Sequence, residues 1–121
     1  MSKRILVVED HEDNRRIVRE LLASAGLEII EATDGEEGLA LARSHSPDLI
    51  LMDIQLPVLD GYQATLKIKA DPALKSIPVI AVTSYALSGD DARAFDAGCV
   101  AYVTKPFSPR QLLAVIREHL A

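Results

Sequence analysis

Five short apolar runs, separated by segments with helical spacing, constrain the fold of this chain more than any other feature. Each run is too short for a buried helix and fits a strand that is covered on both faces. Strands that alternate with helices imply right-handed crossovers and a parallel sheet. The sequence therefore predicts an α/β fold, a (βα)5 doubly wound five-stranded parallel sheet. Its expected strands are residues 5–8, 27–30, 49–52, 79–82 and 100–103.

Capping residues predict where the helices between these strands begin and end. Gly26 and Gly98 lie where the first and fourth helices should end, since glycine readily adopts the left-handed backbone of a C-terminal cap. Three helices, the second, fourth and fifth, should begin at a polar residue that accepts a backbone hydrogen bond. The expected N-caps are Asp34, with Glu37 three residues later, Ser88 before two aspartates, and Ser108 before Pro109.

Length and charge limit the class of protein. The 121 residues fit one domain spanning 1–121. The net charge of −5 comes without a basic stripe, so direct nucleic-acid binding is not expected. Cys99 is the single cysteine, and no apolar run is long enough to span a membrane. These features predict a cytoplasmic protein without a membrane segment.

Polar residues follow four of the five expected strands. Glu9 and Asp10 follow the first, Asp53 the third and Thr83 the fourth, and Lys105 comes just after the fifth. In open parallel sheets, ligands and chemistry gather at the carboxyl ends of the strands. Asp53 by itself could merely end a strand and begin a turn, and each of the other residues has a similarly plain interpretation. Together their complementary types predict a functional site.

The chemistry of such a site follows from its charges. Two carboxylates about 4 Å apart repel by about 4 kcal/mol at an effective dielectric near 20, so converging carboxylates favour a bound cation such as Mg²⁺. A carboxylate beside that metal can accept a phosphoryl group and form an aspartyl phosphate. The transferred group needs a metal, a hydroxyl donor and an ammonium around it. Asp10, Thr83 and Lys105 could supply these three.

The whole chain resembles the CheY-like response regulator receiver domains. The resemblance rests on Val-Val-Glu-Asp at 7–10, Asp-Leu-Ile-Leu-Met-Asp-Ile-Gln-Leu-Pro-Val-Leu-Asp-Gly at 48–61, Val-Thr-Ser at 82–84 and Tyr-Val-Thr-Lys-Pro-Phe at 102–107. Within the family, the segment Met-Asp-Ile-Gln-Leu-Pro at 52–57 most resembles that of single-domain DivK-type regulators. The resemblance implies the strand order 2-1-3-4-5.

The resemblance also implies a role for each acidic residue. Asp53 matches the phosphoacceptor and Asp10 the direct Mg²⁺ ligand, while Glu9 matches a second acidic residue that acts largely through water. Gln55 matches the position whose backbone carbonyl completes the metal site. His11 fits no ligand spacing and is expected on the surface, beside the acidic pocket.

Four further residues match the switching part of the family site. Thr83 matches the hydroxyl that binds a phosphoryl oxygen, and Lys105 the lysine that pairs with another. Pro106 matches a proline that follows a cis peptide bond. Tyr102 matches an aromatic residue that turns inward on activation. Tyr85, near the pocket mouth, is hypothesised to hinder the hydrolytic water.

The function implied is that of a two-component response regulator with no output domain in this chain. A histidine kinase or histidine phosphotransfer protein would donate phosphoryl to Asp53, and the fourth helix, fifth strand and fifth helix would present the altered face to a downstream protein. Such a protein is a phosphorylation switch and not an enzyme, since it catalyses only its own phosphotransfer and dephosphorylation.

Three alternatives remain open at this point. The chain could be a receiver domain cut from a hybrid histidine kinase or a multidomain regulator. An aspartyl-phosphate phosphatase of the haloacid-dehalogenase type would need an aspartate two residues after Asp53, where Gln55 stands. A flavodoxin-like carrier would need a phosphate-binding loop after the first strand, where the acidic segment 9–13 would repel phosphate.

Overall fold

The computed structural model describes residues 3–56, 58–83 and 90–120. Tyr85 and Ser88, singled out above, and the proline of the segment 48–61, Pro57, lie outside the described residues. The expected strands are all present, with ends shifted by one or two residues. The elements in chain order are β1 (Arg4–Val8), α1 (Glu12–Ser24), β2 (Glu28–Ala32), α2 (Gly35–His45), β3 (Leu49–Asp53), α3 (Gly61–Ala70), β4 (Val79–Thr83), α4 (Asp90–Ala97), β5 (Ala101–Thr104) and α5 (Pro109–His119).

The strands form one parallel sheet in the order β2-β1-β3-β4-β5, which confirms the predicted α/β topology. The register between neighbouring strands determines which residues meet at the carboxyl edge of the sheet. Val8 at the end of β1 pairs with Met52, so Glu9 comes level with Asp53. Asp53 in turn pairs with Val82, which brings Thr83 close to the same edge. Residues from three separate strands therefore meet at one end of the sheet.

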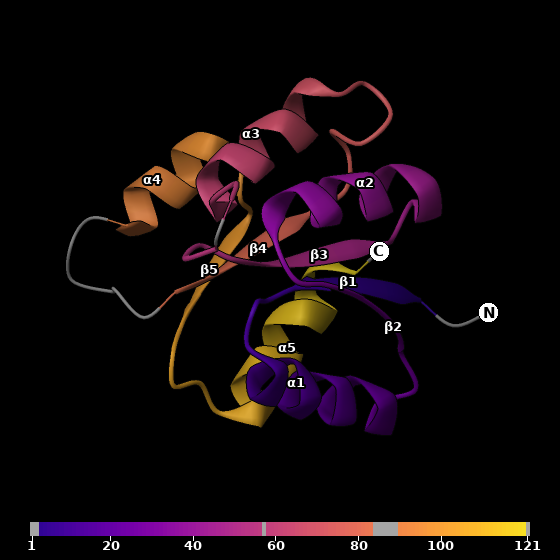
Figure 1. The fold of residues 1–121 in the computed structure, drawn as a ribbon. Helices are drawn as coiled ribbons and strands as arrows, with labels where there is room; N and C mark the ends of the chain where they lie inside the picture. The colour runs from indigo at the N-terminus through magenta and orange to yellow at the C-terminus, as the bar shows by residue number, and fades with distance from the viewer. Residues whose placement is uncertain (1–2, 57, 84–89, 121) are drawn as a thin grey trace.

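Helices cover both faces of the sheet, with α2, α3 and α4 on one side and α1 and α5 on the other (Figure 1). The first hydrophobic core lies between the sheet and α2, α3 and α4, and the second lies between the sheet and α1 and α5. Because side chains alternate along a strand, Leu6 and Val8 point into the first core and Ile5 and Val7 into the second. Cys99 is buried. The two cores hold the central strands rigid, so the residues at the strand ends have a fixed frame.

The helix ends largely follow the capping predictions. The Asp34 side chain accepts a hydrogen bond from the Glu37 backbone N–H at 2.8 Å, and Ser108 accepts one from Gln111 at 3.4 Å. Glu37 reaches back to the N–H of Thr33, one residue before the cap. Gly26 has a φ of 79°, as a C-terminal cap requires. Within the described ranges, no helix has the length and apolar character to cross a membrane.

The loop after β3 turns back sharply against the strand that it leaves. A Cβ atom on Gly61 would lie 2.3 Å from the carbonyl oxygen of Asp53, a distance that no side chain tolerates. The Gly61 N–H donates to the carbonyl of Ile54 at 3.1 Å and closes the turn. Glycine at this position therefore lets α3 begin directly beside Asp53 and fixes the path of the intervening segment.

Candidate functional site

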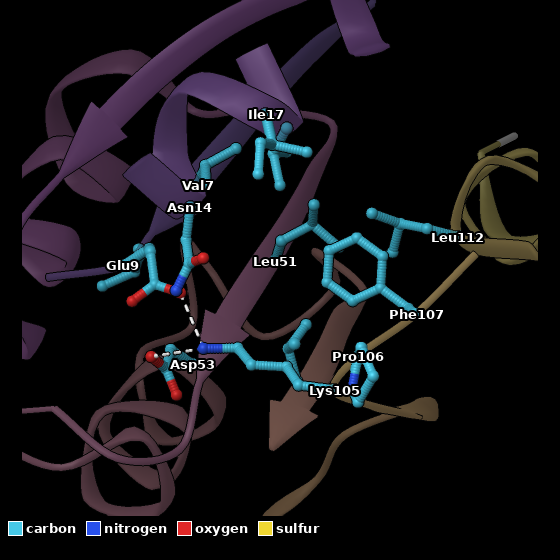
Figure 2. Close-up of a pocket in the computed structure, with 13 residues that line it drawn as sticks. Val7, Glu9, Asn14, Ile17, Leu51, Asp53, Lys105, Pro106, Phe107 and Leu112 are labelled. Carbon is cyan, nitrogen blue, oxygen red and sulfur yellow. Dashed lines mark hydrogen bonds and ion pairs between the residues drawn. The ribbon is translucent and has the colours of Figure 1, made fainter. Parts of the chain in front are cut away.

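The Lys105 ammonium joins two buried carboxylates at the carboxyl edge of the sheet. Its Nζ lies 2.7 Å from Oε1 of Glu9 and 3.2 Å from Oδ2 of Asp53 (Figure 2). Only 5% of Glu9 and 3% of Asp53 is exposed, so these ion pairs are shielded from water. Residues 9, 53 and 105 come from the ends of β1, β3 and β5, as the sequence predicts. The direct pairing of Lys105 with Glu9 was not expected.

One ammonium does not fully compensate the charge of two buried carboxylates. As a result, the pKa values of Asp53 and Glu9 shift in opposite directions. Burial, followed by the neighbouring Glu9 carboxylate, raises the pKa of Asp53 to about 7, and the charge of Lys105 opposes this only in part. Burial alone would raise the pKa of Glu9, but hydrogen bonds from Asp53 and Lys105 outweigh it and lower that pKa. Of the two carboxyl groups, Asp53 therefore takes up a proton more readily than Glu9.

Gln55 contacts both Asp53 and Thr83. Its backbone N–H donates to Oδ1 of Asp53 at 3.0 Å, and its side-chain Nε2 donates to Oγ1 of Thr83 at 3.0 Å. Thr83 is fully buried at the end of β4. The site residues of β3 and β4 are therefore linked through one residue, Gln55. The sequence interpretation attached importance to the Gln55 backbone carbonyl and missed its amide, since a contact across 28 residues leaves no sequence pattern.

The acidic residues that follow β1 offer oxygen ligands. Ligand atoms of Glu9, Asp10 and His11 all lie within 4.8 Å of one another. Oδ1 of Asp10 is buried and accepts no hydrogen bond from the described residues, although Nδ1 of His11 lies 3.1 Å away. A buried carboxylate oxygen without a donor is suited to a hard cation, so these residues fit Mg²⁺. His11 is exposed and lies beside the acidic cluster, as expected.

The remaining predicted residues lie near this edge. Lys105 and Pro106 are joined by a cis peptide bond, which confirms the expectation for Pro106. Tyr102 is half-buried on β5 and packs against the first core. Its part in switching stays a prediction.

An apolar cleft of about 500 Å³ leads away from the charged residues. Figure 2 shows its walls, with Ile17 of α1 on one side and Phe107 and Leu112 on the other, and with the Lys105 ion pairs at one end. Half of Ile17 is exposed, so part of this apolar wall is open to solvent. The site is thus reached beside an apolar surface formed by α1 and the segment before α5.

Fold and site together define a class: a doubly wound α/β domain that presents a buried aspartate, acidic neighbours and a lysine at the carboxyl edge of its sheet. The chain belongs to the response regulator receiver domain family, whose model matches residues 5–117.

Relatives of known name agree with this assignment. The chain is 46% identical over 120 residues to the polar-differentiation response regulator DivK of Brucella ovis, a match that covers 99% of this chain and 98% of that protein. It is therefore a DivK-like receiver of two-component signal transduction. This membership decides against the phosphatase and the flavodoxin-like carrier.

Solved structures show the same fold. The receiver domain of a sensor histidine kinase from Pseudomonas aeruginosa, solved with magnesium coordinated in its active-site cleft, is 36% identical, with a TM-score of 0.93 and coverage of 99% of this chain and 98% of that one. Chemotaxis protein CheY4 of Vibrio cholerae is 28% identical, with a TM-score of 0.93 and coverage of 99% and 100%. Membership of this family implies that the chain is a signalling protein whose partners are histidine kinases or phosphotransfer proteins.

Proposed function

We propose that the protein is a phosphorylation switch whose phosphoacceptor is Asp53. The observation that carries the proposal is the position of its carboxylate: buried, with one oxygen held by the Gln55 N–H and the other by Lys105. An Asp53 oxygen attacks the phosphorus of a partner's phosphohistidine, the P–N bond breaks, and the departing imidazole takes up a proton. Thr83 and Lys105 then hold the phosphoryl oxygens.

The proposed metal site consists of Asp10, Asp53 and the Gln55 backbone carbonyl, with Glu9 acting through water. The donorless oxygen of Asp10 supports this assignment. When bound, Mg²⁺ would supply the positive charge that offsets the transferred phosphoryl group. The chain's own part is to fix the nucleophile: Lys105 and the Gln55 N–H orient the Asp53 carboxylate, and burial restricts the access of bulk water.

The proposed response surface is formed by α4, β5 and α5. Two large apolar side chains near it, Phe95 and Val100, are 51% and 41% exposed, which suits a face that binds another protein. Only contacts that differ between the two phosphorylation states can shift the balance between conformations. We propose that Tyr102 on β5 carries that difference to the surface.

We also propose that residues 1–121 act as one receiver unit that catalyses only its own phosphotransfer and dephosphorylation. The DivK relative supports this, because the match covers 98% of that protein. The similar receiver of the Pseudomonas sensor kinase supports the alternative, a receiver from a hybrid kinase. The length of the native reading frame separates the two.

The first prediction tests the phosphoacceptor directly. Acetyl phosphate should add a phosphoryl group to the protein only when Mg²⁺ is present, and Asp53→Asn should abolish the addition, as measured by intact-protein mass spectrometry. Asp13→Asn is the matched control, since the Asp13 side chain is 85% exposed and pairs with Arg16 on α1. Phosphoryl incorporation that survives Asp53→Asn would refute the proposal.

A further inference from the structure

The side chain of Gln55 contacts the hydroxyl that the proposed function uses. Its Nε2 lies 3.0 Å from Oγ1 of Thr83, while its backbone N–H holds Asp53. Gln55 is half-buried and Thr83 is fully buried, so neither group is freely solvated. The backbone contact needs no particular side chain, which leaves the amide contact as the specific contribution of glutamine.

The direction of this hydrogen bond decides what the hydroxyl can do. A threonine hydroxyl has one hydrogen to donate and two lone pairs to accept with, whereas the amide nitrogen of glutamine only donates. Thr83 therefore uses a lone pair toward Gln55, and its single hydrogen points away from the amide. A phosphoryl oxygen is an acceptor, so this is the polarity that binding it requires.

Both ends of the contact are held by the backbone. The N–H of Ile54 donates to the carbonyl of Val82 at 3.0 Å, which extends the pairing of β3 and β4 up to the residues before Gln55 and Thr83. The N–H of Lys105 donates to the carbonyl of Thr83 at 2.7 Å. The amide thus spans two fixed strand ends and constrains the hydroxyl rotor.

We propose that Gln55 is a positioning residue that sets the donor direction of the Thr83 hydroxyl toward a phosphoryl group on Asp53. The inference rests on the proposed function and deepens it. It predicts that the hydrogen-bonding polarity of residue 55, more than its size, controls how well the site holds a phosphoryl group.

The test compares two substitutions of similar length. Gln55→Met removes the hydrogen bond, and Gln55→Glu replaces the donor by an acceptor that draws the hydroxyl hydrogen toward itself. Affinity for beryllofluoride, a phosphoryl mimic, is measured by ¹⁹F NMR with Mg²⁺, for each variant alone and in a Thr83→Ala background. Gln63→Met and Gln63→Glu are controls, since Gln63 is exposed on α3. Melting curves show that each variant is folded.

Gln55→Met should weaken beryllofluoride binding about three- to tenfold, and Gln55→Glu more than tenfold. In the Thr83→Ala background, Gln55→Met should change the affinity less than twofold, and Gln55→Glu should retain only the effect of its charge. Such coupling shows that residue 55 acts through Thr83, which a purely structural role would not produce.

Equal effects of Gln55→Met in both backgrounds, or no effect in either, would overturn the inference while leaving the proposed function intact. Failure of the unsubstituted protein to bind beryllofluoride with Mg²⁺ would overturn the proposed function itself. The two failures are therefore distinguishable.

Discussion

In Asp53, burial and the need for a negative charge oppose each other. It is buried, which disfavours its charged form, and as the proposed phosphoacceptor it must be charged to attack phosphorus. Lys105 offsets only part of this cost because it also pairs with Glu9. A divalent cation at the adjacent acidic residues would supply the missing charge, which links the reactivity of Asp53 to metal binding.

The second prediction follows from the raised pKa of Asp53. In metal-free protein, Asp53→Asn should raise the free energy of unfolding by about 1–2 kcal/mol at pH 8 and by much less at pH 5. A raised folded-state pKa means that the folded form keeps its proton up to about pH 7, so stability falls as the pH rises from about 4 through 7. Glu9, whose pKa is lowered, contributes changes only in more acidic solution.

Urea denaturation in EDTA at several pH values measures this difference. A gap between Asp53→Asn and the unsubstituted protein that stays constant from pH 5 to pH 8 would contradict the raised pKa.

The loop between β3 and α3 contains backbone strain at Val58. Val58 has a φ of 69° and is 78% exposed. The left-handed region is unfavourable for a β-branched residue by about 1–2 kcal/mol, and no burial offsets the cost. The strain lies five residues after Asp53, in the segment that carries Gln55 away from the sheet.

The third prediction is that Val58→Gly stabilises the protein by about 0.5–1 kcal/mol, because glycine adopts this backbone freely and the relief exceeds the entropy that glycine adds to the unfolded chain. Val100→Gly is the control, since Val100 is also exposed but its φ is not positive. It should destabilise by a similar amount. Chemical denaturation compares the two, and the same sign of change at both positions would count against strain at Val58.

Helix α1 contributes the exposed apolar side chain beside the site. The fourth prediction is that Ile17→Glu slows phosphotransfer from a phosphorylated histidine partner at least tenfold, since docking would bury a charge, and leaves the reaction with acetyl phosphate unchanged. Leu66→Glu is the matched control: Leu66 is 52% exposed, but on α3, across the sheet (Figure 1). A radiolabel transfer assay measures both, and equal slowing by both variants would contradict a docking role for α1.

The proposed metal binding would change the stability of the whole molecule. The fifth prediction is that Mg²⁺ at about ten times its dissociation constant raises the melting temperature by about 3–6 °C, because a ligand of the folded state stabilises it by mass action. Asp10→Asn should abolish most of the shift, whereas Asp13→Asn should preserve it. Thermal unfolding with and without Mg²⁺ tests this, and an unchanged shift in Asp10→Asn would remove Asp10 from the metal site.

The sequence by itself determined the order and type of the elements. The alternation of apolar runs with helical segments predicted the parallel sheet, and Asp34, Ser108 and Gly26 marked helix ends within a residue. These features depend on hydrogen bonds and burial among residues close in the chain, so short stretches suffice to predict them. The strand-end positions of Asp53 and Thr83 follow from the same local reasoning.

How these residues contact one another depends on the packing of the whole fold. The 2.7 Å contact of Lys105 with Glu9 joins residues 96 positions apart, and the Gln55 amide reaches Thr83 across 28 positions. The raised pKa of Asp53 likewise depends on how deeply the assembled edge is buried. Contact distance, direction and desolvation arise where several strands pack together, and for that reason no local pattern of residues encodes them.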